Sequence, residues 1–275
     1  MFGDLHIHMI LDGVYYRAAI DAQKEHPLDG LVRARLSDYQ ARGVCLLRDG
    51  GDAWGVSLRA RELAGEYGID YRSPAFPIYR RGHYGAFIGR GFDTEDEYRA
   101  LLDEAGEKRA DFIKLMISGL IDFDHFGVLT EPGPEPQDIR RMIELAHAAG
   151  FAVMAHANGD RAVTAALQAG VDSIEHGAYL SESVLLRMAQ QRTLWVPTLS
   201  TIGNLIGSGR YPDAVRGDKA DGGRIGLGSD AGAWHVMHGQ AISDELGYLT
   251  AALGPRTEPL VLEAEAYASV TFCRK

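Results

Sequence analysis

Short apolar runs recur eight times along the chain and alternate with longer amphipathic stretches. The apolar runs cover residues 5–11, 44–48, 69–79, 112–117, 151–156, 172–176, 194–199 and 225–230. Runs of this length are typical of buried strands, whereas the intervening stretches, such as 31–43, 96–109 and 139–150, have helical spacing. The alternation predicts parallel strands joined by right-handed helical crossovers.

Local sequence signals define where several of these helices begin and end. Thr94 followed by Glu97 is a capping-box pattern, because the hydroxyl and the carboxylate can each accept a hydrogen bond from a free amide of the first turn. Four glycines lie where helices are expected to stop before the next strand, namely Gly43, Gly68, Gly150 and Gly170.

Eight strand–helix units predict a closed (β/α)8 TIM barrel of the α/β class, forming a single domain over residues 1–275. An open doubly wound sheet is the alternative. It is disfavoured because no strand is followed by a glycine-rich dinucleotide loop. The segment 88–93 has only two of the required glycines and is expected in a loop.

Composition and charge restrict the class of partner. The chain is 46% apolar and 24% charged, with a formal net charge of −10, which argues against nucleic acid or an anionic membrane as the main partner. No apolar stretch approaches the roughly 20 residues that span a bilayer. Polar residues from Asp4 to Asp12 interrupt the first residues, so no signal peptide is expected there. We therefore expect a cytoplasmic protein with a small-molecule substrate; a homo-oligomer remains open.

Unusual polar residues fall on the predicted strands. Ligand-type side chains lie on the first, fifth, sixth and eighth strands and a lysine on the fourth: His6, His8, His156, His176, Asp230 and Lys114. In a barrel the carboxyl ends of the strands converge on one face. Burying this many polar groups without partners would cost roughly 1–3 kcal/mol each, and a metal ion would provide partners for them. The set therefore predicts a metal site.

Two features of this set allow more than one interpretation. His6 and His8 are two residues apart, so both imidazoles project to one side of a strand, although such pairs often occur by chance. Lys114 would repel a cation in its charged form. It is either a buried lysine paired with a carboxylate such as Asp230, or a neutral amine that captures carbon dioxide and bridges two metals as a carbamate. We favour the second.

These residues are the basis of a family resemblance. The chain resembles the amidohydrolase superfamily, in particular its Xaa-Pro dipeptidase-like and imidazolonepropionase-like branch, over nearly its whole length. The matching stretches are GDLHIH at 3–8, GVCLLRDGG at 43–51, FIKLMISG at 112–119, AHANG at 155–159, SIEHG at 173–177, WVPTL at 195–199, GSDAG at 228–232 and HG at 238–239.

The resemblance implies a dinuclear site and a hydrolytic activity. His6, His8 and Asp230 would hold one divalent ion, and His156 and His176 a second. Carboxylated Lys114 and a hydroxide would bridge the two ions, and Asp230 would act as the proton shuttle. Zinc suits such ligands best, and manganese, iron, nickel and cobalt can occupy sites of this kind.

One departure from that branch concerns a second structural unit. Its members usually carry a small β-sandwich made from residues before the first barrel strand and after the last helix. Here the HxH pair begins at residue 6 and the chain stops at SVTFCRK. We expect the sandwich to be missing, in either a minimal barrel-only member or a shortened form, with the ligand set intact.

The substrate is less constrained than the metal site. The loop at 79–85 offers Arg80 or Arg81 to clamp a carboxylate, and His83 or Tyr84 to bind the scissile carbonyl, unless the arginines are simply solvated. His238 lies near the predicted mouth, and Asn158 could orient the fifth-strand ligand.

We expect hydrolysis of an amide bond in a dipeptide, an N-acyl amino acid or a cyclic amide. One alternative is a mononuclear-metal deaminase of the same fold, which Lys114 and the GSDAG motif disfavour. Another is a non-catalytic relative that uses the barrel for binding. Retention of all six ligand-type residues disfavours this reading.

Overall fold

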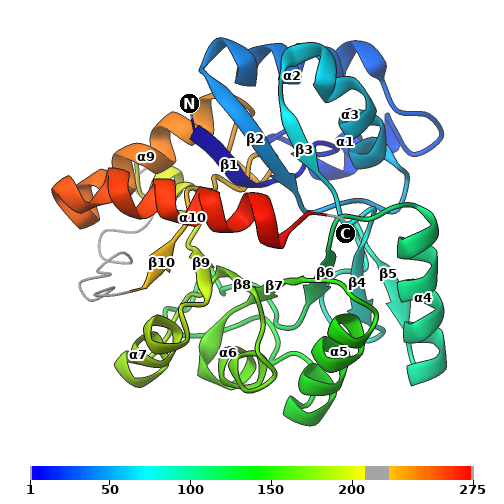
Figure 1. Ribbon diagram of the computed structural model, residues 1–275, viewed down its shortest axis with the longest axis vertical. Coiled ribbons are helices and arrows are strands. Elements are labelled where there is room, and N and C mark those ends of the chain that lie inside the picture. Colours follow the sequence, from blue (N-terminus) through cyan, green and yellow to red (C-terminus); the bar gives the residue numbers. More distant parts are fainter. Residues whose placement is uncertain (1, 208–222, 274–275) are drawn as a thin grey trace.

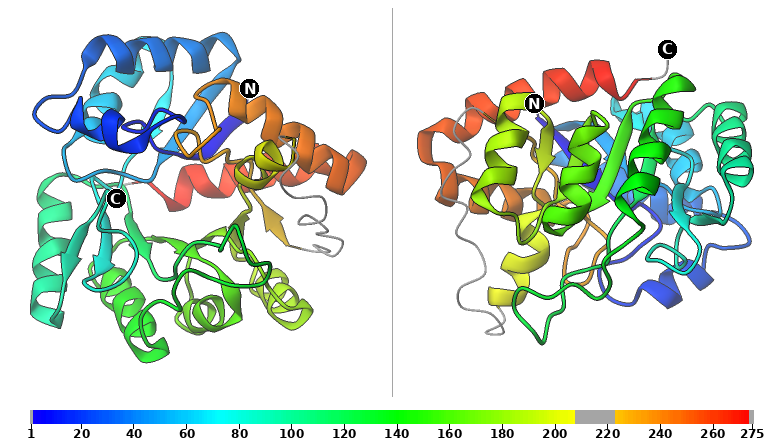
Figure 2. Two further views of the ribbon diagram at one scale, coloured as in Figure 1. Left: turned by 180° about the vertical axis from the view of Figure 1, so that it is seen from behind. Right: turned by 90° about the horizontal axis from the view of Figure 1, so that it is seen from below.

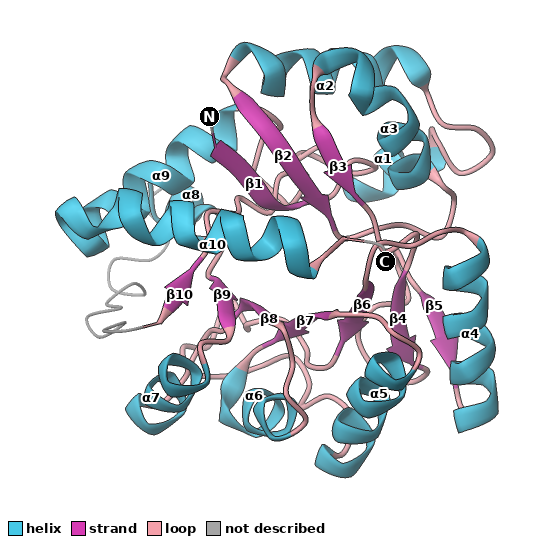
Figure 3. Ribbon diagram, viewed as in Figure 1, coloured by secondary structure: helices cyan, strands magenta, loops and turns pink. Residues whose placement is uncertain are grey.

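The computed structural model describes residues 2–207 and 223–273, and its strands and helices alternate as predicted (Figures 1 and 3). The strands are β1 (Phe2–Ile7), β2 (Val44–Asp49), β3 (Asp70–Arg72), β4 (Pro77–Arg80), β5 (Arg90–Phe92), β6 (Ile113–Met116), β7 (Val153–Ala157), β8 (Ser173–His176), β9 (Leu194–Val196) and β10 (Arg224–Ile225). The α-helices are α1 (Tyr16–Asp21), α2 (Asp29–Ala41), α3 (Val56–Ala64), α4 (Glu95–Glu107), α5 (Pro136–Ala148), α6 (Gly159–Gln168), α7 (Glu182–Gln191), α8 (Leu199–Gly207), α9 (Gln240–Leu253) and α10 (Thr257–Thr271). Two 3-10 helices, η1 (Gly65–Tyr67) and η2 (Gly254–Arg256), follow α3 and α9.

The strands form two parallel sheets that are joined on both sides. One sheet has the order β1-β2-β3 and the other the order β10-β9-β8-β7-β6-β4-β5. At one edge β1 bonds to the segment that follows β10: the amide of Leu5 donates to the Leu227 carbonyl at 2.8 Å, and the amide of Asp230 donates to the His6 carbonyl at 2.7 Å. On the other side, β3 of the first sheet continues through residues 73–76 into β4 of the second sheet. The chain therefore has the predicted (β/α)8 barrel arrangement.

The third predicted strand is broken in the structure. A continuous strand over 69–79 was expected, but β3 and β4 are separated by residues 73–76. Pro74 has no amide hydrogen to donate to a ladder, and Ala75 has a φ of 66°, which extended backbone does not adopt. The break lets β3 pair with β2 while β4 turns to pair with β6.

Two other strand predictions were also inexact. The segment 88–93 was expected in a loop, which is wrong, because Arg90–Phe92 forms β5 beside β4. Phe92 is buried there against Tyr98, which gives this edge strand an apolar anchor. The eighth run, 225–230, is regular only at Arg224–Ile225. A Cβ on Gly228 would lie 2.9 Å from the His6 amide nitrogen, so the chain passes β1 too closely for regular pairing.

The predicted helix boundaries agree with the structure. The Thr94 side chain accepts a hydrogen bond from the Glu97 amide at 3.2 Å and begins α4. All four glycines expected at helix ends have positive φ, with values of 76° at Gly43, 66° at Gly68, 87° at Gly150 and 73° at Gly170. These local signals were sufficient because neither depends on distant residues.

The last helix, α10, lies across the N-terminal end of the barrel. Figure 1 shows it crossing between the two sheets, and Figure 2 shows it from the other sides. Ala264 and Ala268 of α10 pack with Phe272, Phe112 and Leu5 in a buried cluster inside the barrel. The small alanine side chains let the helix approach the strands closely, so this end of the barrel is filled by apolar groups.

Candidate metal centre

The first group of polar residues lies where β1 meets the segment after β10. His6 and His8 are buried, and the Nε2 atom of each lies 3.4 Å from Oδ1 of Asp230. One ligand atom from each of the three residues can be chosen so that all lie within 4.8 Å of one another. The hydrogen bond from the Asp230 amide to the His6 carbonyl fixes this spacing through the backbone. The arrangement suits a divalent cation held by two imidazoles and a carboxylate.

A second group lies at the ends of the neighbouring strands. The ring centroids of His156 and His176 are 4.5 Å apart, and the His176 ring is 5.1 Å from that of His6. In the parallel register, Met116 pairs with His156, which brings Lys114 of β6 beside the same face. The structure thus brings all six predicted ligand-type residues together.

Three buried nitrogen atoms at this centre have no hydrogen-bond partner among the described residues. They are Nε2 of His6, Nδ1 of His8 and Nζ of Lys114. A buried polar group without a partner costs about 1–3 kcal/mol, so each of these atoms requires an explanation. Nδ1 of His8 lies on the ring edge beside Gly50, and Nε2 of the same ring faces Asp230. Imidazole nitrogens with a free lone pair are ligands for divalent metals, and the donor set therefore fits a metal site.

Burial also sets the protonation of these groups. It lowers the pKa of His8 and of His156 to about 3, with further lowering from the nearby Lys114. The imidazoles are therefore neutral at ordinary pH, which is the form that binds metal. Burial lowers the pKa of the Lys114 ammonium and raises that of the Asp230 carboxyl. Both shifts disfavour the charged forms.

Outer partners fix which nitrogen each histidine presents. Nδ1 of His6 donates to Oε2 of Glu175 at 2.7 Å, which leaves Nε2 facing Asp230. Nδ1 of His176 lies 2.8 Å from the Thr198 hydroxyl. Such contacts orient a ligand and set its tautomer. No role was predicted for Glu175 or Thr198, although a glutamate between Ile174 and His176 in an apolar strand already requires a buried partner.

His156 is oriented by the loop after β6. Nε2 of His156 donates to the Gly119 carbonyl at 3.2 Å, and that carbonyl also accepts a bond from Nδ2 of Asn158 at 3.1 Å. Oδ1 of Asn158 accepts from the Ala178 amide at 2.9 Å. Asn158 therefore ties the loops after β6 and β8 together beside His156.

Two of these residues have unusual backbone conformations. His176 has a φ of 68° and Asp230 a φ of 59°, both in the left-handed region that residues other than glycine seldom occupy. Such conformations cost of order 1–3 kcal/mol and concentrate at functional sites. Here the turn breaks the strand alternation after Glu175, so that consecutive side chains both reach the centre.

Among the predicted substrate residues, Tyr84 is the one that reaches this cluster. Its ring centroid lies 4.9 Å from that of His156, and burial raises its pKa. His83 instead donates from Nδ1 to Glu131 at 2.7 Å. Glu131 also accepts from the Tyr84 amide at 2.9 Å, so this pair supports the loop that positions Tyr84.

The two predicted arginines are engaged away from the centre. Arg80 lies 3.2 Å from Asp138 on α5, and Arg81 lies 2.7 Å from Asp93 and 2.8 Å from Glu97 at the start of α4. Asp138 and Glu97 belong to the outer helices, and Asp93 lies just before α4. The structure therefore does not place either guanidinium among the six ligand-type residues.

His238 is likewise committed to a structural contact. Its Nε2 donates to the Leu11 carbonyl at 2.9 Å, and its Nδ1 accepts from the Tyr39 hydroxyl at 3.1 Å. Because both ring nitrogens are used, His238 braces the loop after β1 and has no free nitrogen for a substrate.

A series of aromatic rings leads from the surface to the centre. The Tyr16 ring is 5.7 Å from the Phe87 ring, which is 5.5 Å from the Tyr84 ring beside His156. Tyr15, which is 55% exposed, extends the series outward at 6.4 Å from Tyr16. These rings form a continuous series from Tyr15 to Tyr84, which lies beside His156.

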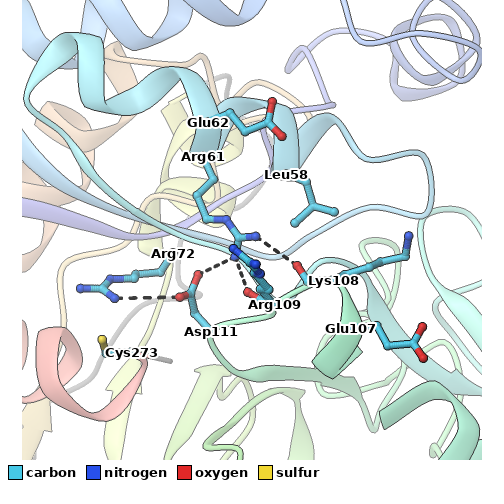
Figure 4. A pocket seen from close by; sticks show the side chains of 9 residues that line it. All are labelled: Leu58, Arg61, Glu62, Arg72, Glu107, Lys108, Arg109, Asp111 and Cys273. Atoms are coloured by element: carbon cyan, nitrogen blue, oxygen red, sulfur yellow. Dashed lines mark hydrogen bonds and ion pairs between the residues drawn. The ribbon is translucent and has the colours of Figure 1, made fainter. Parts of the chain in front are cut away.

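A cavity of about 560 Å³ lies elsewhere, between α3, the turn before β6 and the end of α10 (Figure 4). Arg61 crosses it and donates to Asp111 at 3.1 Å and to the Arg109 carbonyl at 2.7 Å. None of the predicted ligand residues lines it. This cavity is therefore separate from the group of ligand-type residues at the strand ends.

Comparison of the sequence with known proteins gives partial matches. No protein-family model matches the chain. An uncharacterized protein of Mycobacterium tuberculosis is 32% identical over 129 residues, covering 40% of this chain and 34% of that protein. Ochratoxinase of Aspergillus niger is 28% identical over 170 residues, covering 60% of this chain and 33% of the enzyme. The matches thus span about a third of the length of these relatives.

Solved structures extend the likeness to nearly the whole chain. A Xaa-Pro dipeptidase with bound methionine superposes with a TM-score of 0.75 at 20% identity, covering 98% of this chain and 74% of that one. The Aspergillus niger ochratoxinase structure gives 0.73 at 20% identity, covering 98% and 71%. The chain therefore shares the fold of these enzymes over nearly its whole length. The predicted resemblance to the amidohydrolase superfamily is confirmed at the level of the fold.

Within residues 2–207 and 223–273, no helix is both long enough and apolar enough to cross a membrane.

Proposed function

We propose that this chain is a metal-dependent hydrolase that cleaves an amide bond. The observation that supports it best is the buried group of His6, His8 and Asp230 at the C-terminal strand ends of the barrel, whose ligand atoms lie within 4.8 Å of one another. Among the described residues, Nε2 of His6 and Nζ of Lys114 have no hydrogen-bond partner there. This is the face on which barrels of this type place their chemistry.

His6, His8 and Asp230 would hold one divalent ion, and His156 and His176 a second, with zinc the first candidate. Ions bound there would supply Lewis acidity, which lowers the pKa of water and polarises a carbonyl. The chain's own contribution is to keep the imidazoles neutral by burial and to fix their free nitrogens through Glu175, Thr198 and Gly119.

Lys114 would act as a bridging ligand after carboxylation. Its amine nitrogen would attack carbon dioxide and lose one proton, giving a carbamate with two oxygen donors. Burial favours the neutral amine that this step requires, and Nζ has no hydrogen-bond partner among the described residues. A lysine held in a stable ion pair would be expected to show a close carboxylate partner instead.

Asp230 would move the proton. Its Oδ1 lies 3.4 Å from both His6 and His8, so the carboxylate is adjacent to the point at which water would be activated. Burial raises its pKa, which makes it a better proton acceptor than an exposed aspartate. It would take a proton from water and deliver it to the leaving nitrogen.

The proposed substrate is a dipeptide, an N-acyl amino acid or a cyclic amide with a large apolar group. The names of several neighbours, such as Xaa-Pro dipeptidase and prolidase, support peptide-like substrates. The aromatic faces of Tyr16, Phe87 and Tyr84 support an apolar group beside the scissile bond. Burial of such a group against them would contribute roughly 25 cal/mol per Å².

The test is metal content and hydrolysis on protein purified without chelators or nickel affinity. We expect about two equivalents per chain, falling in His176→Asn and in Lys114→Ala, and hydrolysis of at least one member of a panel of dipeptides and N-acyl amino acids. His125→Asn is the matched control, because His125 is exposed and pairs with Asp122.

Two results would redirect the assignment. A single equivalent that Lys114→Ala leaves unchanged would indicate a mononuclear site and favour a deaminase. Absence of metal, even after incubation with zinc or manganese and bicarbonate, would overturn the metalloenzyme.

A further inference from the structure

The ladder between β1 and β2 is irregular beside the first metal-ligand residue. Asp4 pairs with Leu47 and Ile7 with Asp49, so two residues of β1 oppose one residue of β2. The extra residue displaces the backbone at Leu5 and His6. The Leu5 carbonyl accepts a hydrogen bond from Nε of Arg48 at 2.7 Å, so a side chain replaces a ladder contact at this point.

Arg48 then continues across the barrel interior to β8. Its Nη2 donates to Oε1 of Glu175 at 2.7 Å and to the Ser173 hydroxyl at 3.2 Å. The other carboxylate oxygen of Glu175 accepts from Nδ1 of His6 at 2.7 Å. Arg48 and Glu175 are both fully buried, so this ion pair is not weakened by solvent. A removal of either partner would leave the other charge uncompensated.

The far side of the Arg48 guanidinium rests on the last helix of the chain. Its central carbon lies 4.4 Å from the ring centroid of Phe272, the C-cap residue that directly follows α10. Nη1 of Arg48 has no hydrogen-bond partner among the described residues, so the aromatic face is a main support for this part of the cation. Phe272 is itself fully buried.

These contacts form an unbroken series from α10 to the metal-ligand residue His6. We propose that Arg48 is a positioning residue that couples the seating of α10, through Phe272 and Glu175, to the affinity of the centre for a divalent cation. The inference rests on the proposed function in that it requires a metal to bind at His6. Because coupling is reciprocal, metal binding also stabilises α10 on the barrel.

The alternative is that these residues contribute to folding alone. Phe112 offers a matched control, because its ring lies edge-on to Phe272 at 5.4 Å in the same buried cluster. Replacing Phe112 by leucine removes a similar volume from that cluster and leaves the stack of Arg48 on Phe272. A purely structural role predicts equal effects of Phe112→Leu and Phe272→Leu on metal affinity.

The experiment measures zinc affinity by competition with a fluorescent chelator, together with hydrogen exchange of α10 with and without zinc. Glu175→Gln removes the carboxylate with little change of shape and should weaken zinc binding about 10–100-fold. Phe272→Leu should weaken it about fivefold or more, and Phe112→Leu by less than twofold. In the unmodified chain zinc should slow exchange in α10, and Glu175→Gln should abolish that protection.

The outcomes separate the two proposals. Zinc binding by the unmodified chain with equal affinities in Phe272→Leu and Phe112→Leu, and no protection of α10, overturns the coupling and leaves the hydrolase assignment intact. No zinc binding by the unmodified chain overturns both.

Discussion

The rings of Tyr84 and His156 lie 4.9 Å apart, so an aromatic side chain from the loop after β4 packs against a proposed metal ligand at the end of β7. Phe87 and Tyr16 continue this surface outward. Under the proposed function, these rings would contact the apolar portion of a substrate bound at the centre, and that portion would contribute to binding.

Phe87→Ala is therefore expected to raise KM for N-acetyl-L-phenylalanine about tenfold while leaving kcat within twofold. The loss corresponds to about 1.4 kcal/mol of apolar contact in binding. The KM for N-acetyl-L-alanine should change little. Phe126→Ala is the control, because Phe126 is exposed and its ring faces Tyr179 instead. Equal effects on both substrates would contradict the assignment of these rings to the substrate.

His6 is expected to be the neutral Nδ1–H tautomer in the metal-free protein. Nδ1 of His6 donates a hydrogen bond to Oε2 of Glu175, and only a protonated ring nitrogen can donate. Long-range proton–nitrogen correlation spectra of histidine-labelled protein distinguish the two tautomers. Observation of the Nε2–H form would show that Glu175 does not orient His6.

Gly50→Ala should weaken metal binding without unfolding the protein. A Cβ at Gly50 would lie 2.9 Å from Nδ1 of His8 and still closer to its Cε1, so the imidazole must move. We expect at least a tenfold loss of zinc affinity, in line with the loss of a correctly oriented ligand. Gly247→Ala is the control: nothing lies within 4 Å of that position in α9, and alanine there should stabilise the helix by about 0.5–1 kcal/mol.

Asp4 should make the stability of the metal-free protein depend on pH. Burial raises its pKa from 3.8 to about 7, so between these values the folded state keeps a proton that the unfolded chain releases. Its contribution to the free energy of unfolding is fully present below pH 3.8 and falls by up to about 4 kcal/mol as the pH rises to 7.

Urea unfolding at pH 4.5, 6.0 and 7.5 tests this dependence. The difference in unfolding free energy between the unmodified chain and Asp4→Asn should shrink or reverse as the pH rises. Ser229→Ala, which removes a hydroxyl that donates to Asp4 at 2.6 Å, should steepen the dependence because that bond lowers the pKa. Parallel pH profiles for the unmodified chain and Asp4→Asn would refute the shift.

Much of the fold could be predicted because its signals are local. The apolar runs located the strands, and the Thr94 cap and the four glycines located helix ends. The break between β3 and β4 was missed because it depends on Ala75 adopting a positive φ beside Pro74, for which the apolar run 69–79 gives no warning. β5 was missed because a three-residue edge strand has too few side chains to show a period.

The six ligand-type residues could be predicted because each ends or interrupts an apolar strand. Arg48 and Glu175 could not, because their roles depend on a contact between β2 and β8 across 127 positions of sequence. For Arg80 and Arg81, by contrast, a role was predicted that their contacts do not support. A loop position near the expected mouth suggested a substrate clamp, but Arg80 pairs with a carboxylate on α5, and Arg81 pairs with carboxylates just before and on α4.

The packing of α10 against the barrel also determines how molecules enter and leave. Phe112, Phe272 and their neighbours fill the N-terminal end of the barrel with fully buried side chains. Under the proposed hydrolase function, substrate, water and both products would then use the end of the barrel that carries the C-terminal strand ends. A product that dissociates slowly from the aromatic side chains there would block the next substrate. We therefore expect release of the more apolar product to limit turnover, and we expect that product to be a competitive inhibitor.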